Sequence, residues 1–227
     1  MPLRVLITAG PTYEPLDPVR FLGNRSTGKM GYALAEAFAA AGATVTLVSG
    51  PTNLPDPTPA AIATVRVETA TQMFAAAEVV AETADIWVFA AAVADYRPAA
   101  VATEKIKKSG EILTLELVKN VDIAATLGRR KRPEQFAVGF ALETTNELAH
   151  AQDKLYRKGF NLIVLNSLRD AGAGFGHDTN QVTVLDRAGQ VLNFGLRKKT
   201  DLATDLVALV LARCQLPPGT EQMIEIR

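Results

Sequence analysis

Short runs of apolar, often β-branched residues alternate along the chain with longer segments in which apolar residues recur at spacings of three and four. The first run, Leu3–Thr8, is typical of a parallel strand that is buried on both faces. Similar runs predict further strands at Thr44–Val48, Val65–Val67, Ile86–Ala91, Phe136–Phe140 and Leu162–Leu165. The helical spacing predicts helices at Gly28–Ala41, Thr71–Ala84, Val121–Leu127 and Thr145–Arg157.

This alternation of strands and helices predicts the fold class. Right-handed crossovers make successive strands parallel and place helices on both faces of the sheet. We therefore expect an α/β fold, a doubly wound, Rossmann-like parallel sheet that binds its ligands at the carboxyl ends of the strands. The chain has 227 residues, of which 48% are hydrophobic, and we expect residues 1–227 to form a single domain.

One segment that departs from the alternation is the connection Ala9–Thr27, between the first strand and its helix. Connections of this kind usually have about 2 to 6 residues, and much longer ones are commonly functional or disordered. Prolines at positions 11, 15 and 18 restrict the backbone and favour an ordered segment. We therefore expect this connection to contribute to a functional site.

The second departure is Arg97–Asn120, hereafter the arm, which lacks a helical period. The turn-forming pair Ser109-Gly110 precedes an alternating run, Ile112–Val118, and together they predict a hairpin. Near the C-terminus, Gln181–Leu185 and Val191–Phe194 are predicted as the two strands of a second hairpin. A final helix is predicted at Thr200–Arg213.

The charge balance excludes some classes of partner. The 24 basic and 24 acidic residues cancel, which argues against a nucleic-acid partner and against an anionic membrane. Locally, however, nine basic residues stand against four acidic ones between Arg97 and Arg132, which fits either a solvated surface or a site for an anionic ligand. A single cysteine, Cys214, and the absence of a signal-peptide pattern or an apolar stretch of membrane-spanning length lead us to expect a cytoplasmic protein.

Several local patterns remain ambiguous when taken singly. Residues 23–30 nearly match the phosphate loop of NTPases, but Met30 offers no hydroxyl for Mg²⁺ and the loop does not directly follow the first strand. What remains is a helix N-terminus that could bind an anion. Lys154 and Lys158 share a helix face, as a pair of phosphate ligands or as solvated side chains. His150 and His177 have no partner at metal-ligand spacing.

Five longer motifs, taken together, resemble the phosphopantothenoylcysteine synthetase family. They are ITAGPTYEPLDPVRFLGNRSTGKMG (7–31), AAAVADYRP (90–98), EKIKK (104–108), VKNVDI (118–123) and VGFALET (138–144). The resemblance implies activation of 4′-phosphopantothenate by CTP to an acyl-cytidylate, with L-cysteine then displacing CMP. It further implies Mg²⁺, a homodimer and association with a flavin-dependent decarboxylase half, with no flavin in this domain.

The resemblance also implies roles for individual residues. Asn24 and Lys105 correspond to catalytic positions of the family. The substrate-binding positions correspond to Gly10, Arg20, Asn24 and Ala92. The nucleotide-binding positions correspond to Phe89, Ala90, Ala91, Asp95, Lys105, Val118, Lys119, Asn120, Val121, Phe140, Lys154 and Lys158. No metal ligand is assigned, and Val121 replaces a proline that the family usually has.

The arm carries two further expectations. Its lysine-rich segment, Ile106–Gly110, is expected to be mobile without nucleotide, while Lys105 is expected to reach the triphosphate. Leu113, Leu115 and Leu117 form an apolar face that packs either on a second copy or on the sheet of its own chain. A nicotinamide-dependent oxidoreductase and a non-catalytic, flavin-binding partner of the decarboxylase remain the alternatives to a ligase.

Overall fold

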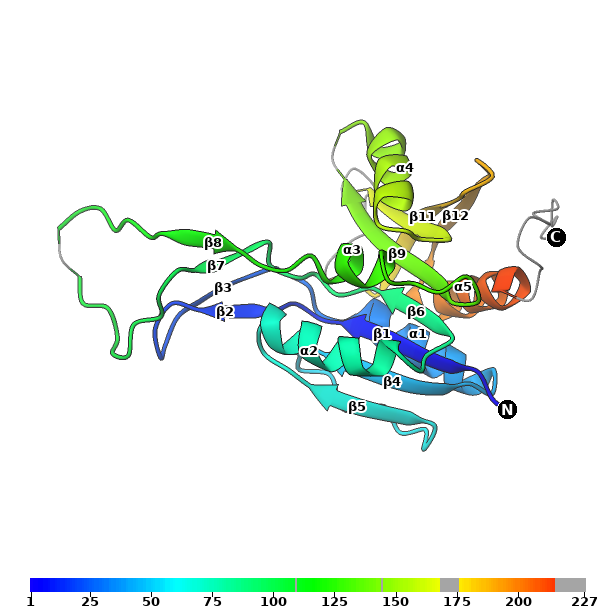
Figure 1. Ribbon diagram of the computed structural model, residues 1–227, viewed down its shortest axis with the longest axis horizontal. Coiled ribbons are helices and arrows are strands. Elements are labelled where there is room, and N and C mark those ends of the chain that lie inside the picture. The colour runs from blue at the N-terminus through cyan, green and yellow to red at the C-terminus, as the bar shows by residue number, and fades with distance from the viewer. Residues whose placement is uncertain (109, 144, 168–175, 215–227) are drawn as a thin grey trace.

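An eight-stranded sheet forms the centre of the protein, in the order β12-β11-β10-β9-β6-β1-β4-β5 (Figure 1). The computed structural model describes residues 1–108, 110–143, 145–167 and 176–214. The parallel strands are β1 (Arg4–Ala9), β4 (Thr44–Ser49), β5 (Ile62–Arg66), β6 (Ile86–Phe89), β9 (Phe136–Glu143) and β10 (Leu162–Ser167). The predicted C-terminal hairpin, β11 (Thr179–Asp186) and β12 (Val191–Lys198), extends the sheet as antiparallel strands.

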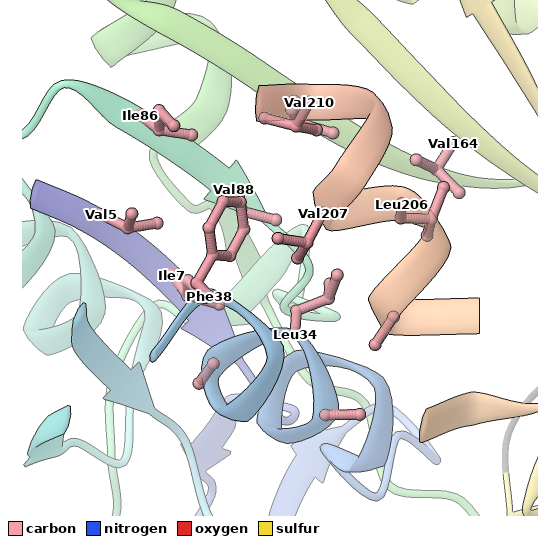
Figure 2. Close-up of a cluster of buried hydrophobic side chains, with 14 of the residues drawn as sticks. Val5, Ile7, Leu34, Phe38, Ile86, Val88, Val164, Leu206, Val207 and Val210 are labelled. Carbon is pink, nitrogen blue, oxygen red and sulfur yellow. The ribbon is translucent and has the colours of Figure 1, made fainter. Parts of the chain in front are cut away.

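Helices cover both faces of the sheet. On one face lie α1 (Lys29–Ala40) and α5 (Lys199–Cys214), and on the other α2 (Ala70–Ala81), α3 (Ile123–Gly128) and α4 (Glu147–Arg157). Alternate side chains of β1 serve the two cores: Val5 and Ile7 pack with Phe38 of α1 and Val207 of α5, whereas Leu6 packs on the opposite face. Figure 2 shows the first of these cores, in which side chains of α1 and α5 meet those of β1 and β6. The continuous apolar runs arise because these strands are buried from both sides.

The strand order places a topological switch point between β1 and β6. From β1 the chain proceeds outward to β4 and β5, and then returns to build β6, β9 and β10 on the other side. In such sheets the loops after the two central strands part in opposite directions and leave a crevice at the carboxyl ends. The expected α/β, doubly wound fold with a C-terminal hairpin and helix is confirmed.

Two hairpins project together from this edge of the sheet (Figure 1). One consists of β2 (Tyr13–Pro15) and β3 (Phe21–Gly23), inside the long connection after β1, and the sequence analysis missed both strands. The other is the arm, whose paired part is limited to β7 (Tyr96–Pro98) and β8 (Leu117–Lys119). The strand predicted over Ile112–Val118 was therefore too long, because its N-terminal part finds no strand partner among the described residues.

Other differences concern the ends of elements. The strand predicted at Val65–Val67 begins three residues earlier and ends at Arg66, because this edge strand is largely exposed and lacks a long apolar run. Helix α2 begins after Thr69, whose side chain forms a capping box with Gln72, and it ends at Ala81 rather than Ala84.

Candidate functional site

A cavity of about 360 Å³ lies at the switch point, within the usual range of small-ligand sites, which is roughly 300–1,000 Å³. Its walls come from the ends of β1, β6, β9 and β10, the start of α1, and the segments around α3 and α4. On the β6 side, the wall consists of Ala90, Ala91 and Ala92, whose small side chains leave the backbone accessible to a ligand. The cavity therefore stands where an α/β sheet of this topology binds its ligands.

The N-terminus of α1 borders the cavity and offers hydrogen-bond donors. Gly28 precedes the helix with a φ of 80°, a backbone conformation that side-chain-bearing residues rarely adopt, and no side chain caps the helix there. The first N–H groups of the helix have no partners within it. The helix begins after β3 rather than directly after β1, so this segment is not a phosphate loop of the NTPase type but retains an anion-binding helix end.

Asn24 links the two loops that flank the crevice. Its Nδ2 donates to the carbonyl of Ala92 at 2.9 Å and to that of Val93 at 3.2 Å. Because Asn24 follows β3 and the two carbonyls follow β6, the amide bridges the connection after β1 and the turn after β6. This places the side chain predicted to be catalytic at the wall of the cavity.

Backbone hydrogen bonds fix the turn after β6. The N–H of Ala92 donates to Gly10 at 2.9 Å, and the N–H of Ala94 donates to the hydroxyl of the buried Thr12 at 3.0 Å. From the arm, Asn120 donates through Nδ2 to the carbonyl of Ala94 at 2.9 Å. Gly10 thus supports the turn from beneath and does not line the cavity.

Two lysines from α4 and its end reach the cavity, and each pairs with a carboxylate. Lys154 Nζ lies 2.5 Å from Glu143 Oε1, and Lys158 Nζ lies 2.9 Å from Asp122 Oδ2. Burial raises the pKa of Asp122, but hydrogen bonds from the N–H of Ala125 and from Lys158 outweigh it, so the net pKa lies below the ordinary value. Each lysine is therefore held at the wall of the cavity by its carboxylate partner.

The sequence analysis missed a polar group at the opposite end of the cavity. Lys199, the first residue of α5, is buried and donates to the carbonyl of His177, while Lys29 pairs with Asp178 at 2.6 Å. Burial, together with the nearby charge of Lys29, lowers the pKa of Lys199. Asn166 and Asn180 are hydrogen-bonded to each other and also line this end. No local pattern could have indicated this group, because the antiparallel extension of the sheet brings its members together.

Most of the residues predicted from the resemblance converge on the cavity. Its walls include Asn24, Phe89, Ala90, Ala91, Ala92, Asp95, Asn120, Val121, Phe140, Lys154 and Lys158. Five predicted residues lie elsewhere, namely Gly10, Arg20, Lys105, Val118 and Lys119. Lys105 is exposed on the arm, and Arg20 lies at the turn between β2 and β3, so the projecting hairpins hold both cations away from the wall.

The described part of the chain contains no preformed metal cage. Within residues 1–108, 110–143, 145–167 and 176–214, no three or more His, Cys, Asp or Glu side chains are grouped so as to hold a metal ion. His150 lies 3.5 Å from Glu143, in an exposed position. The same residues include no helix of the length and apolarity that a bilayer crossing requires.

The sequence of the chain is similar to a protein family and to several known proteins. The DNA/pantothenate metabolism flavoprotein C-terminal domain family matches residues 2–213. The chain is 46% identical over 209 residues to the coenzyme A biosynthesis bifunctional protein CoaBC of Vibrio cholerae, covering 91% of this chain and 52% of the relative. It is 47% identical over 208 residues to a cysteine/cysteine sulfinic acid decarboxylase of an unknown prokaryotic organism, covering 92% of this chain and 58% of that relative.

The chain therefore spans about half the length of these relatives. A solved structure, the crystal structure of the C-terminal domain of a coenzyme A biosynthesis bifunctional protein CoaBC, matches with a TM-score of 0.78 and 41% sequence identity. The match covers 93% of this chain and 95% of that domain. The similarity thus extends over a whole structural unit of the longer protein.

Proposed function

Because the chain belongs to the DNA/pantothenate metabolism flavoprotein C-terminal domain family, we propose that it is a phosphopantothenate–cysteine ligase of coenzyme A biosynthesis. The observation that carries the proposal is the 41% identity to the C-terminal domain of CoaBC over nearly the whole of both chains. The cavity at the switch point supports it, because eleven residues that the resemblance assigns to substrate or nucleotide line that one cavity. The relatives give no support to the nicotinamide-dependent oxidoreductase.

The proposed reaction has two steps. A carboxylate oxygen of 4′-phosphopantothenate attacks the α-phosphorus of CTP, the bond from that phosphorus to the β-phosphate oxygen breaks, and pyrophosphate leaves. The amine of L-cysteine then attacks the acyl carbon, CMP departs with the electron pair, and the amine loses a proton. Neither step requires a protein nucleophile, so the main work of the chain is to position anions and to stabilise the charge that develops on phosphate oxygens.

The cavity offers suitable groups for this work. Lys154 and Lys158 lie on one wall and the N-terminus of α1 on another, so a triphosphate would find cations and N–H donors on both sides. In the structure the lysines pair with Glu143 and Asp122. We expect nucleotide phosphates to replace these two carboxylates as the partners of the lysines, while the lysine side chains stay at the wall of the cavity.

Asn24 is proposed to act at the reacting carbonyl. Its side chain already bridges the two loops of the crevice through the carbonyls of Ala92 and Val93. A neutral amide can both donate and accept, so it can contact an acyl oxygen in the first step and an amine in the second. A charged side chain at this place would face the anionic substrate and would lack one of these capacities.

The proposed assembly is a homodimer in which the arm of one copy reaches the cavity of the other. The three residues of the predicted apolar face, Leu113, Leu115 and Leu117, are exposed on the arm, so the sheet of their own chain does not cover them. Lys105 stands on this projecting arm and outside the walls of the cavity of its own chain. Mixing Lys105→Gln protein with Asn24→Asp protein tests the arrangement, because exchange of subunits should restore up to a quarter of the wild-type sites; no recovery would place Lys105 and Asn24 of one chain in one site.

The proposed co-substrate and metal follow from the resemblance. CTP is the proposed nucleotide, and Mg²⁺ would enter with its phosphates, since Mg²⁺ is usually held by phosphate oxygens, waters and one or two carboxylates. Asp95 is an exposed carboxylate at the cavity, but the described residues form no cage, and no step is assigned to the metal. A flavin-dependent decarboxylase half, in the cytoplasm, is the proposed partner protein, and we expect no flavin in this domain.

The decisive experiment measures pyrophosphate release from CTP with 4′-phosphopantothenate and without cysteine, because it isolates the first step. We expect CTP to support this release strongly and ATP to support it weakly. Equal rates with ATP would remove the preference for cytosine but leave the ligase, whereas no release with any nucleoside triphosphate would overturn the ligase. A yellow protein, or thermal stabilisation by NADPH and not by CTP, would favour the alternatives.

A further inference from the structure

The buried carboxylate of Asp17 lies at the turn between β2 and β3, and Asp17 is not among the residues that line the cavity. Its side chain is 0% exposed, although the neighbouring Pro18 and Val19 are exposed. Burying a carboxylate is costly unless hydrogen bonds and an opposite charge compensate for the lost water. The surroundings of Asp17 should therefore reveal why a charge is kept at this turn.

Five hydrogen bonds reach the two carboxylate oxygens. Oδ1 accepts from the N–H groups of Val19 and Arg20, both at 2.9 Å, and Oδ2 accepts from Arg20 Nη2 at 2.6 Å and Nε at 3.0 Å. The fifth donor is the N–H of Ile106 in the arm, 3.0 Å from Oδ2. The guanidinium of Arg20, with these N–H groups, holds the pKa of Asp17 well below its usual range.

The ion pair of Asp17 and Arg20 is hydrogen-bonded to both backbone groups of Ile106. While Oδ2 of Asp17 accepts from the N–H of Ile106, Nη2 of Arg20 donates to its carbonyl at 2.9 Å. We call Asp17, Arg20 and Ile106 the Asp17 cluster. A second contact nearby, from the N–H of Ala102 to the carbonyl of Leu16 at 3.0 Å, also joins the arm to this turn. The arm is thus tied to the β2–β3 hairpin beyond its own paired strands.

The hairpin that holds the arm is itself fixed to the body of the protein. Glu14 of β2 is 1% exposed, and its Oε1 accepts from the N–H of Ala70 at the start of α2, at 2.9 Å. The N–H of Tyr13 donates to the carbonyl of Glu68 at 2.8 Å, and the rings of Tyr13 and Phe21 stack at 3.8 Å. These contacts fix the β2–β3 hairpin against the start of α2, and the hairpin in turn fixes the place of the Asp17 cluster.

We infer that Asp17 is a positioning residue for the proposed ligase: its carboxylate fixes the arm at Ile106 and thereby sets the position of Lys105, the preceding residue. Because Arg20 belongs to the same cluster, the two cations that the resemblance assigns to the ligands are presented as one unit. This inference rests on the proposed function for its catalytic consequence. The attachment of the arm is a separate claim that needs no activity to test.

The conservative variant is Asp17→Asn. An asparagine retains one oxygen to accept from Val19 and Arg20 at the turn, but it removes the negative charge and turns an NH₂ group toward the other donors. A purely local turn residue should tolerate this change, whereas a residue that holds the arm should not. Asp56→Asn is the matched control, because Asp56 also pairs with an arginine, Arg66, at 2.6 Å, and this exposed pair includes no residue of the arm.

Trypsin provides the first readout, since it cleaves after Lys105 and Lys107 at either side of Ile106. We expect Asp17→Asn to accelerate this cleavage about tenfold or more in the folded protein, and Asp56→Asn to leave it unchanged. Arg20→Lys, which keeps the charge but loses the paired donors of the guanidinium, should accelerate it as well. If both cluster variants are folded and are cut at the wild-type rate, the attachment is refuted whether or not the chain is a ligase.

A double-mutant cycle provides the second readout, measured as the rate of acyl-cytidylate formation in a single turnover. Asp17→Asn alone should lower this rate about tenfold, and Asp56→Asn should not change it. In a Lys105→Gln background, Asp17→Asn should have little further effect, because the residue acts through Lys105. Fully additive losses would overturn the positioning role. Wild-type protein without activity but with the expected trypsin pattern would instead refute the proposed function and leave the attachment standing.

Discussion

Lys158, at the end of α4, and Asp122, at the start of α3, form an ion pair with 2.9 Å between Nζ and Oδ2 at the wall of the cavity. The carboxylate also caps α3, since its Oδ1 accepts from the N–H of Ala125 at 3.0 Å. Asp122 therefore stabilises a helix N-terminus and holds a cation at the same time. A phosphate that binds Lys158 must compete with this carboxylate.

Substitutions of Asp122 should therefore distinguish its role as the cap of α3 from its competition with phosphate for Lys158. Asparagine caps helices about as well as aspartate does, so Asp122→Asn should preserve α3 while releasing Lys158 for a nucleotide. We expect CTP affinity, measured by calorimetry, to stay equal or to rise by up to several-fold, whereas Lys158→Met should lower it about tenfold or more.

Asp122→Ala serves as the control for the cap. It should free Lys158 in the same way but lower the free energy of unfolding by about 1 kcal/mol. A large loss of CTP affinity in Asp122→Asn would mean that the carboxylate contacts the ligand directly and does not compete with the phosphate for Lys158.

The close packing of α1 on β1 leads to a prediction about stability. A Cβ added to Gly31 would stand 2.5 Å from Cβ of Ala9, which is too close for either atom. Alanine favours a helix over glycine by about 1 kcal/mol, but overpacking costs roughly 1–3 kcal/mol, so Gly31→Ala should lower the free energy of unfolding in urea. Gly195→Ala is the control, because a Cβ there meets nothing within 4 Å, and this change should be neutral or stabilising. A Gly31→Ala protein as stable as wild type would show that α1 can shift away from β1.

The depressed pKa of Asp17 predicts a specific dependence on pH. Its pKa is lowered chiefly by Arg20, so the folded protein keeps the carboxylate ionised under conditions in which the unfolded chain, with an ordinary aspartate pKa of about 3.9, becomes protonated. The stability that Asp17 contributes is therefore fully present above that ordinary value and is lost as the pH falls below it.

The measurement compares wild type with Asp17→Asn, which cannot titrate at this position. The difference between their free energies of unfolding should be constant from pH 7 to pH 5 and should shrink below about pH 4. A difference that already shrinks near pH 6, or that persists unchanged at pH 2.5, would contradict a strongly depressed pKa for Asp17.

The sequence predicted the parallel strands well because they are buried on both faces and therefore carry uninterrupted apolar runs. The same criterion failed for β5, an edge strand with an exposed, mixed pattern. It also failed for β2 and β3, which have three residues each and are stabilised by a buried Glu14 and an aromatic stack rather than by an apolar period. Elements held by such specific contacts have no periodic signal to detect.

The residues of the candidate site also fall into those that the sequence could predict and those that it could not. The longer motifs predicted Ala90 to Ala92, Asn24, Lys154 and Lys158 as site residues, and the fold brings all of them to the wall of the cavity at the switch point. Lys199 was missed, since only the antiparallel addition of β11 and β12 brings it to the cavity. The Asp17 cluster was missed for the same reason: Asp17 and Ile106 are 89 positions apart, and a sequence alone gives no sign that two projecting hairpins run together.

Asn24 carries the last prediction, because its amide supports the site and is also proposed to act in the reaction. Asn24→Asp keeps the shape but replaces the donor by a carboxylate beside the carbonyls of Ala92 and Val93, which now repel it, and beside an anionic substrate. We expect ligation to fall by about 10²-fold or more, the scale of removing one preorganised donor, with the overall fold retained in circular dichroism.

Asn24→Gly distinguishes the amide from the backbone. It removes the side chain without introducing charge, and the loss of two exposed hydrogen bonds should cost only about 1–2 kcal/mol in stability. If the amide contacts the reacting group, this variant should also lose most of its activity, and its first step should be slowed in pyrophosphate release. Near-normal turnover in Asn24→Gly would show that the side chain has no chemical role, and that a charge at this position harms the enzyme only through repulsion.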